Sequence, residues 1–340
     1  MSTPTSDPAF GGLRDQSKRA AAVTAARMYY GAGQSTHEIA AYLKVSRSTV
    51  SRLLAYARES GVVEVRVHEN ADHVSGLAAE LAGRYPRVRF EIVGVHAAAT
   101  SGRVNTSVAQ YGAHVVAGMV EPGMTVGVAW GNTVSSLIDH LHPRPVGDLQ
   151  VVQLNGAGNS ASLGLAYASD IIVRFAENFA GSHHLFPVPA FFDHAETKEA
   201  LWKERSIRQI LALQEKADLL LFSTGALVGD PASHIYTAGY LSKREADELR
   251  AAGVVGDIGT VFYDAAGSGD LPINRRSSGP PLSLYARSRR SVCVASGVGK
   301  VPGLAAALAA GYISDLIVDN RTAIELLRRT TPGTRARLLR

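Results

Sequence analysis

The sequence has few of the features that mark secreted or membrane-bound proteins. Its 340 residues include a single cysteine, Cys293, so no disulfide can form within the chain. The apolar run SVCVAS around Cys293 predicts a buried core residue. The chain opens on no signal-like segment, and no apolar run is long enough to span a membrane. We therefore expect a cytoplasmic protein with no membrane partner.

Several motifs of enzymes and nucleotide-binding proteins are also absent. There is no G-x-x-x-x-G-K-[ST] phosphate loop, no clean G-x-G-x-x-G between a strand and a helix, and no Gly-x-Ser-x-Gly. His183 and His184 lack a third ligand at a spacing that suits a metal. The sequence accordingly predicts no catalytic residue, no metal and no cofactor.

The charge is unevenly distributed along the chain. Hydrophobic residues make up 46% and charged residues 19%, which is typical of a packed globular protein, and the length suggests two or three domains. The formal net charge is +5, and residues 14–66 alone hold nine Lys/Arg against four Asp/Glu. A basic N-terminal part beside a nearly neutral body fits a nucleic-acid partner at the N-terminal end.

Residues 34–60 are the most informative stretch, and they predict two short helices joined by a tight turn. Ser35 has the position of an N-cap, with Glu38 at the capping-box spacing, and Ser46 is the N-cap candidate of the second helix. Lys44 falls in the turn, where Gly is usual because the left-handed conformation costs other residues on the order of 1 kcal/mol. The residues expected to face outward at the start of the second helix are Arg47, Ser48, Thr49, Ser51 and Arg52.

This helix tip has the chemistry of a DNA-reading element. It combines short hydroxyl side chains with two arginines and contains no acid, and arginine can contact guanine edges or phosphates in the major groove. The predicted DNA-binding residues are therefore the five outward residues together with Ser35 and Ser46. An ordinary helical hairpin with a solvated polar face is the alternative interpretation.

The segments around this helix pair complete a small N-terminal domain over residues 14–69. Residues 15–32 predict a helix that packs behind the pair, and residues 62–69 alternate apolar and polar as an edge strand does. That strand is either the wing of a winged helix-turn-helix or a plain linking strand. Residues 1–13 are rich in Ser, Thr, Pro and Gly, which predicts a disordered tail.

Residues 70–330 predict a larger, Rossmann-like α/β domain, followed by a basic tail at 331–340. A helix over 72–85 comes first, and apolar strands then alternate with helices, which indicates a parallel sheet covered on both faces. The expected strands are 89–95, 124–130, 149–156, 183–191, 217–225, 291–297 and 313–319, with helices near 103–119, 132–141, 163–180, 195–215, 301–310 and from 321.

Five turns in this body carry Gly, Ser, Thr or Asn at strand ends, where open α/β sheets bind ligands. Tight connections also use Gly for purely structural reasons, but five such turns together favour a ligand site. Backbone amides, hydroxyls and one lysine suit an anion, while an acid and asparagines suit hydroxyl groups, as in a sugar-phosphate or polyol pocket. The turns lie within 125–141, 151–160, 219–227, 251–267 and 294–300, and the fourth places Asp257 in a Gly-flanked turn.

The order of these motifs resembles the SorC/DeoR-type family of bacterial sugar-responsive transcriptional regulators. The stretch STHEIAAYLKVSRSTVSRLLAYARESGVVEVRV is followed by GMTVGVAWGNTVSSL, VVQLNGAGN, LFPVPA, GVVGDIGTVFYDAAG, ASGVGK and ISDLIVDNRTA. The resemblance covers roughly residues 15–330. It implies that the N-terminal module binds operator DNA, that the body binds an effector in a fold like that of sugar-phosphate isomerases and deaminases, and that the protein is a homodimer or homotetramer.

The resemblance also implies roles for particular residues. Gly131, Asn132 and Thr133 occupy the loop that holds an effector phosphate, although that loop often reads Gly-Thr-Thr. The positions expected to contact the rest of the effector are Asn155, Gly156, Asp257 and Lys300. The helix after Thr133 offers no lysine that could form a Schiff base, so the effector can be a sugar, a polyol or a sugar phosphate.

Two other functions remain open from the sequence. One is a sugar-phosphate isomerase- or deaminase-like enzyme that carries a DNA-binding module, for which Asp257 is the best general-base candidate. The other is a structural DNA-binding protein without an effector, against which the glycine turns argue.

Overall fold

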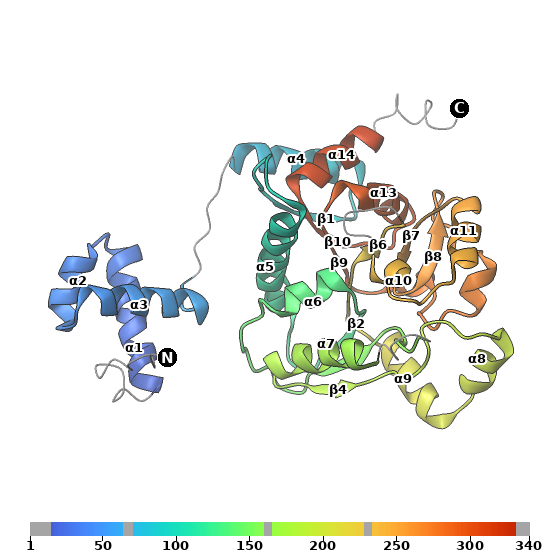
Figure 1. Cartoon of the computed structure of the whole chain (residues 1–340), viewed down its shortest axis with the longest axis horizontal. Helices are drawn as coiled ribbons and strands as arrows, with labels where there is room; N and C mark the ends of the chain where they lie inside the picture. The colour runs from blue at the N-terminus through green and yellow to red at the C-terminus, as the bar shows by residue number, and fades with distance from the viewer. Residues whose placement is uncertain (1–14, 64–70, 160–164, 228–232, 331–340) are drawn as a thin grey trace, which may run out of the picture. The chain divides into compact units, whose positions relative to one another are not determined.

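The structure is a computed structural model that describes residues 15–63, 71–159, 165–227 and 233–330 (Figure 1). The chain forms two compact units, residues 1–68 and 69–340. The predicted tails at 1–13 and 331–340 lie outside the described residues, as does most of the strand expected at 62–69. Within the described ranges, no helix has the length and apolar character needed to cross a bilayer.

The first unit is built from three helices around a small apolar core. Helix α1 (Asp15–Ala26) ends in a π-helical turn, Arg27–Gly31, and is followed by α2 (Thr36–Leu43) and α3 (Arg47–Glu59). All three helices contribute small or branched side chains to the core. The spacing of apolar residues three or four positions apart along each helix predicts this. These core residues are Ala22, Ala25, Ala26, Ile39, Ala40, Val50, Leu53, Leu54 and Ala57.

Helices α2 and α3 have the predicted N-caps, and the turn between them is left-handed. Ser35 accepts a hydrogen bond from the Glu38 amide while the Glu38 carboxylate accepts one from the Ser35 amide, a complete capping box. Ser46 caps α3 by accepting from the Thr49 amide at 3.1 Å. Lys44 is left-handed, with φ 54° and ψ 41°, so the chain adopts the usual turn geometry without the usual glycine.

The second unit is organised around a seven-stranded, wholly parallel sheet with the strand order β1-β10-β9-β5-β2-β3-β4. From β2 the chain moves outward through β3 and β4, and it then returns to β5 on the other side of β2. That reversal between β2 and β5 is a topological switch point. The strands are β1 (Arg89–Val93), β2 (Thr125–Val128), β3 (Gln150–Gln153), β4 (Ser182–His184), β5 (Leu219–Phe222), β9 (Ser291–Ala295) and β10 (Asp315–Asp319).

Helices cover both faces of this sheet, as the apolar strands predict. Alternate residues of one strand enter different cores: Leu219 and Leu221 pack on one face, and Leu220 and Phe222 on the other. The first face is covered by α5 (Ser101–Met119), α6 (Asn132–Ile138) and α7 (Leu165–Asn178). The second is covered by α4 (Ala71–Arg84), α12 (Leu282–Arg287), α13 (Val301–Ala309) and α14 (Asn320–Thr330).

A smaller antiparallel sheet is attached to this body. It has the order β6-β7-β8, from β6 (Thr224–Gly225), β7 (Val254–Ile258) and β8 (Val261–Asp264). The prediction that Asp257 lies in a turn was therefore wrong, because it is a residue of β7 and the turn falls at Gly259 and Thr260. The remaining helical segments between β6 and β9 are α10 (His234–Thr237), α11 (Lys243–Ala251) and a 3-10 turn at Pro272–Arg275.

The single helix expected near 195–215 is two helices, α8 (Ala195–Leu201) and α9 (Arg205–Glu215). The break has a tertiary cause. The Trp202 ring packs edge-on against Phe186 and Phe192, with centroids 5.6 Å away in both cases, and Glu204 turns extended before α9. Packing of one large aromatic side chain has overridden the local helical pattern.

Candidate functional site

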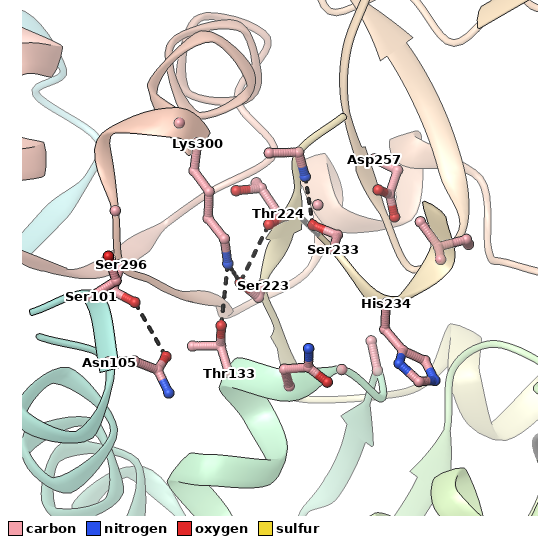
Figure 2. A pocket seen from close by; sticks show the side chains of 18 of the residues that line it. Ser101, Asn105, Thr133, Ser223, Thr224, Ser233, His234, Asp257, Ser296 and Lys300 are labelled. Carbon is pink, nitrogen blue, oxygen red and sulfur yellow. Dashed lines mark hydrogen bonds between the residues drawn. The ribbon is translucent and has the colours of Figure 1, made fainter. Parts of the chain in front are cut away.

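A cavity of about 320 Å³ opens at the carboxyl ends of β2, β5, β9 and β10, beside the switch point. Its size lies at the lower end of the range of small-molecule sites. Figure 2 shows Lys300 and Thr133 between two groups of side chains, with Asp257 and His234 to one side and Ser101, Asn105 and Ser296 to the other. Six of the seven predicted effector-binding residues line this cavity: Gly131, Asn132, Thr133, Asn155, Asp257 and Lys300.

Two cationic side chains line the cavity. Arg321 donates to the Ala99 carbonyl at 2.8 Å, and Lys300 is the cation that lies among hydroxyls. It ends the short 3-10 segment Val298–Lys300 after β9, and its ammonium donates to Ser223 Oγ at 2.8 Å and to Thr133 Oγ1 at 3.2 Å. Burial lowers the pKa of Lys300. Among the described residues, no carboxylate lies within ion-pair distance of its ammonium. Its hydrogen-bond partners are hydroxyls, and the Asp257 carboxylate interacts with its charge only at longer range. An anionic ligand would give this ammonium the close counter-charge that Asp257 does not supply.

Two acids line the cavity: Asp319 accepts from the Gly297 amide and the Thr322 hydroxyl, and the second is Asp257. Burial raises the pKa of its carboxyl to about 6, although the Thr260 amide, the Tyr236 hydroxyl at 3.4 Å and the nearby Lys300 charge each favour the ionised form. The position depends on Gly225 in the neighbouring strand, because a Cβ there would lie 1.8 Å from Asp257 Oδ1. The carboxylate therefore occupies space that only glycine leaves free.

The loop after β3 is held through its backbone by two buried side-chain N–H donors. The Asn155 carbonyl accepts from Trp130 Nε1 at 3.1 Å and from Gln153 Nε2 at 2.7 Å. Gly156 is the one predicted residue that does not line the cavity. A Cβ on Gly156 would lie 2.4 Å from the Val188 carbonyl oxygen and 2.5 Å from that of Pro189, so close backbone packing explains this glycine.

The loop after β2 brings Asn132 and Thr133 to the start of α6. Thr133 is buried and contacts Lys300, whereas Asn132 is exposed and its Oδ1 accepts from the Tyr167 hydroxyl at 3.1 Å. The two side chains consequently have different neighbours, and the hydroxyl of Thr133 is the one beside the cation.

Several lining residues were missed by the sequence analysis. His234 lies against Tyr167, Trp130 and Tyr240 at ring-centroid distances of 4.9, 6.1 and 5.8 Å, and burial lowers its pKa. It comes from α10, which follows no strand of the main sheet, so the strand-end rule could not find it. Ser101 begins α5, the helix that follows β1, so the same rule applied to the end of β1 points to it.

In the first unit, the structure separates the predicted DNA-binding residues into two groups. Arg47, Ser48, Ser51 and Arg52 are exposed on α3. The outward orientation predicted for Thr49 was wrong: it is 8% exposed, and its hydroxyl lies 2.8 Å from Ser46 Oγ. Thr49 lies one helical turn before Leu53, on the side of the helix that also carries Val50 and faces the core. The prediction treated the first residues of the helix as equally exposed and did not apply this periodicity.

The side chains of the other two predicted residues, Ser35 and Ser46, are engaged as helix caps. Elsewhere in the described ranges, no three His, Cys, Asp or Glu side chains gather as metal ligands do.

Comparison with known families gives matches across both units. Residues 69–328 match the Sugar-bind family model, described as "Putative sugar-binding domain", and residues 14–65 match a homeodomain-like helix-turn-helix model. The chain is 34% identical over 314 residues to the deoxyribonucleoside regulator of Bacillus subtilis (strain 168), covering 92% of this chain and 99% of that protein. It is 27% identical to the sorbitol operon regulator of Klebsiella pneumoniae, covering 90% and 97% respectively.

Solved structures agree with these matches. A domain of a possible sugar-binding transcriptional regulator from Arthrobacter aurescens TC1 superposes with a TM-score of 0.71 at 39% identity, covering 76% of this chain and all of that one. The full-length sorbitol operon regulator SorC of Klebsiella pneumoniae superposes with a TM-score of 0.75 at 25% identity, covering 93% and 100%.

Proposed function

Since the chain belongs to the SorC/DeoR-type family of sugar-binding transcriptional regulators, we propose that an anionic sugar or polyol derivative bound beside Lys300 controls its binding to operator DNA. The chain is a regulator and not an enzyme, because its relatives and structural neighbours are transcriptional regulators. The enzyme alternative therefore has no support beyond the fold.

The observation that carries the proposal is the buried Lys300 ammonium, which lines the cavity and forms its hydrogen bonds with hydroxyls and not with a carboxylate. A phosphate placed there would pair with the ammonium and accept hydrogen bonds from Thr133 and Ser223. Hydroxyl groups on the rest of the effector would meet Asp257, whose carboxylate is an acceptor. This favours a sugar phosphate or polyol phosphate over a neutral sugar.

On the DNA side, we assign base or phosphate contacts to Arg47, Ser48, Ser51 and Arg52, the exposed residues of α3. Ser35, Ser46 and Thr49 support that surface through the caps and do not need to touch DNA. We further propose that the protein acts in the cytoplasm as a homodimer or homotetramer, since paired modules recognise two half-sites of an operator.

The test is operator affinity measured with and without effector. DNA selected by the full-length protein from a random-sequence pool serves as operator, and fluorescence anisotropy follows its binding while ribose 5-phosphate, sorbitol 6-phosphate or their unphosphorylated forms are added. We expect at least one phosphorylated compound to change operator affinity 5- to 150-fold, the usual range of allosteric coupling. Lys300→Met should abolish that response but keep the affinity for operator alone. A response that is unchanged in Lys300→Met would contradict the proposed anion site.

A further inference from the structure

We infer that Thr224 and Asn155 select the effector by its hydroxyl groups, so that the cavity prefers a polyhydroxylated anion to a simple one. The inference rests on the proposed function. It adds Thr224 to the effector-binding residues and gives Thr224 and Asn155, which was already expected to contact the effector, a role apart from the Lys300 contacts. Thr224 lies in β6, within the 219–227 turn, and is not one of the seven residues predicted individually to bind the effector.

Thr224 Oγ1 and Asn155 Oδ1 are buried polar atoms that line the cavity and have no hydrogen-bond partner among the described residues. Both side chains belong to residues only 1% exposed. A buried polar group without a partner is destabilising, and native structures contain few of them. Two that line the same cavity indicate a ligand that completes their hydrogen bonds.

The backbones of both residues are also held in place. Thr224 pairs with Ile258 between β6 and β7, so its backbone belongs to the antiparallel sheet. The Asn155 backbone carbonyl accepts from the side chains of Trp130 and Gln153. The Gln153 backbone carbonyl in turn accepts from Gln214 Nε2 at 2.8 Å. Preorganised groups of this kind discriminate between ligands, because they do not reorient when a ligand group is missing.

The chemistry of the unpartnered atoms defines the ligand group. Asn155 Oδ1 and the Asp257 carboxylate are acceptors, and a hydroxyl such as that of Thr224 can donate or accept, so the ligand must present donors. Lys300 in the same cavity disfavours an ammonium donor by charge repulsion. Neutral hydroxyl groups remain, which makes the ligand an anion with several hydroxyls on its carbon chain.

The first experiment uses the ligand-free, full-length protein. Thr224→Val replaces a hydroxyl that has no partner by a methyl group, so we expect the melting temperature of the body to rise by roughly 2–5 °C. Thr322→Val is the matched control: Thr322 is fully buried, but its hydroxyl donates to Asp319 Oδ2 at 2.6 Å and accepts from the Gly297 amide at 3.0 Å. The control should lower the melting temperature. A fall of similar size in both variants would show that the Thr224 hydroxyl is structural and would overturn the inference.

The second experiment measures binding by calorimetry with inorganic phosphate, ribose 5-phosphate and sorbitol 6-phosphate. The wild type should bind at least one polyhydroxylated phosphate 10-fold or more tightly than inorganic phosphate. Thr224→Val and Asn155→Leu should each remove most of that advantage and leave the affinity for inorganic phosphate unchanged, since inorganic phosphate engages Lys300. An advantage that survives in both variants, or that the wild type lacks, would overturn the inference.

The outcomes separate this inference from the proposed function. If a polyhydroxylated phosphate binds through Thr224 and Asn155 but does not alter operator affinity, the control of DNA binding fails and the hydroxyl selection stands. If operator affinity responds to a ligand whose binding is unchanged in both variants, the proposed function stands and the assignment of these two residues fails.

Discussion

The face of α3 and the cavity differ in how the chain assembles them. The candidate DNA-binding face comes from one short stretch, residues 34–60. The N-caps, the turn and the exposed start of α3 all lie within it, so their positions follow from the spacing of nearby residues. The cavity instead collects side chains from Ser101 to Arg321, brought together by the order of strands in the sheet. Local spacing therefore determines the first site, and long-range pairing determines the second.

The largest expected effect tests the local site. We expect Arg47→Ala and Arg52→Ala each to weaken operator binding by about 1–3 kcal/mol, or roughly 5- to 150-fold, and the double variant by more, because each arginine contributes a contact to bases or phosphates. Anisotropy with the selected operator measures this. Arg58→Ala is the charge-matched control at the other end of α3, where Arg58 lies 3.4 Å from the Tyr30 hydroxyl. If the control weakens binding equally, general basic charge and not the tip of α3 accounts for affinity.

The next effect tests the long-range site through Asp257. Its pKa is raised from 3.8 to about 6, so the folded state binds the proton more tightly than the unfolded state. The carboxyl therefore lowers the free energy of unfolding progressively as the pH rises from about 4 to 6. Above that range the loss stays constant at about 3 kcal/mol. Asp257→Asn should raise the free energy of unfolding at pH 7–8 by up to that amount, with the gain vanishing near pH 4.

Urea unfolding at pH values from 4 to 8 measures this gain. Asp270→Asn, which removes an exposed carboxylate from the same domain, is the control for charge alone. If the gain for Asp257→Asn does not depend on pH, then packing and not ionisation accounts for the difference in stability between the wild type and the variant.

These two sites show what the sequence could and could not predict. The parallel sheet and most of its strands were predicted because apolar runs bounded by glycine turns are local signals. Asn155 and Lys300 were found because they lie in the segments that follow strands of that sheet. His234 and the packing role of Gly156 were not found, since both depend on contacts with segments distant in the chain. The strand position of Asp257 was missed because its hairpin pairs with β6, which has only two residues.

A smaller effect concerns the cap of α3. Ser46 accepts from the Thr49 amide and also approaches the Thr49 hydroxyl, so Ser46→Ala leaves a helix end without its cap. We expect a loss of about 1 kcal/mol in the stability of the first unit, with operator affinity falling because the tip of α3 frays. Thermal unfolding followed by the helical circular-dichroism signal measures the stability, and anisotropy with the selected operator measures the affinity. Ser60→Ala, at the other end of α3, is the matched control, because its hydroxyl donates to the Tyr56 carbonyl and caps no amide.

The smallest effect tests whether the local site tolerates strain. Lys44 occupies the left-handed region at φ 54°, which costs a non-glycine residue about 1 kcal/mol, whereas glycine loses more chain entropy on folding. The two terms oppose each other, so Lys44→Gly should stabilise the first unit by about 0.5 kcal/mol or less. Lys18→Gly, at the fourth residue of α1, should instead destabilise it by about 1 kcal/mol. If Lys44→Gly were as destabilising as Lys18→Gly, the lysine side chain would contribute to the turn through more than its backbone, and spacing alone would no longer account for the geometry of this helix pair.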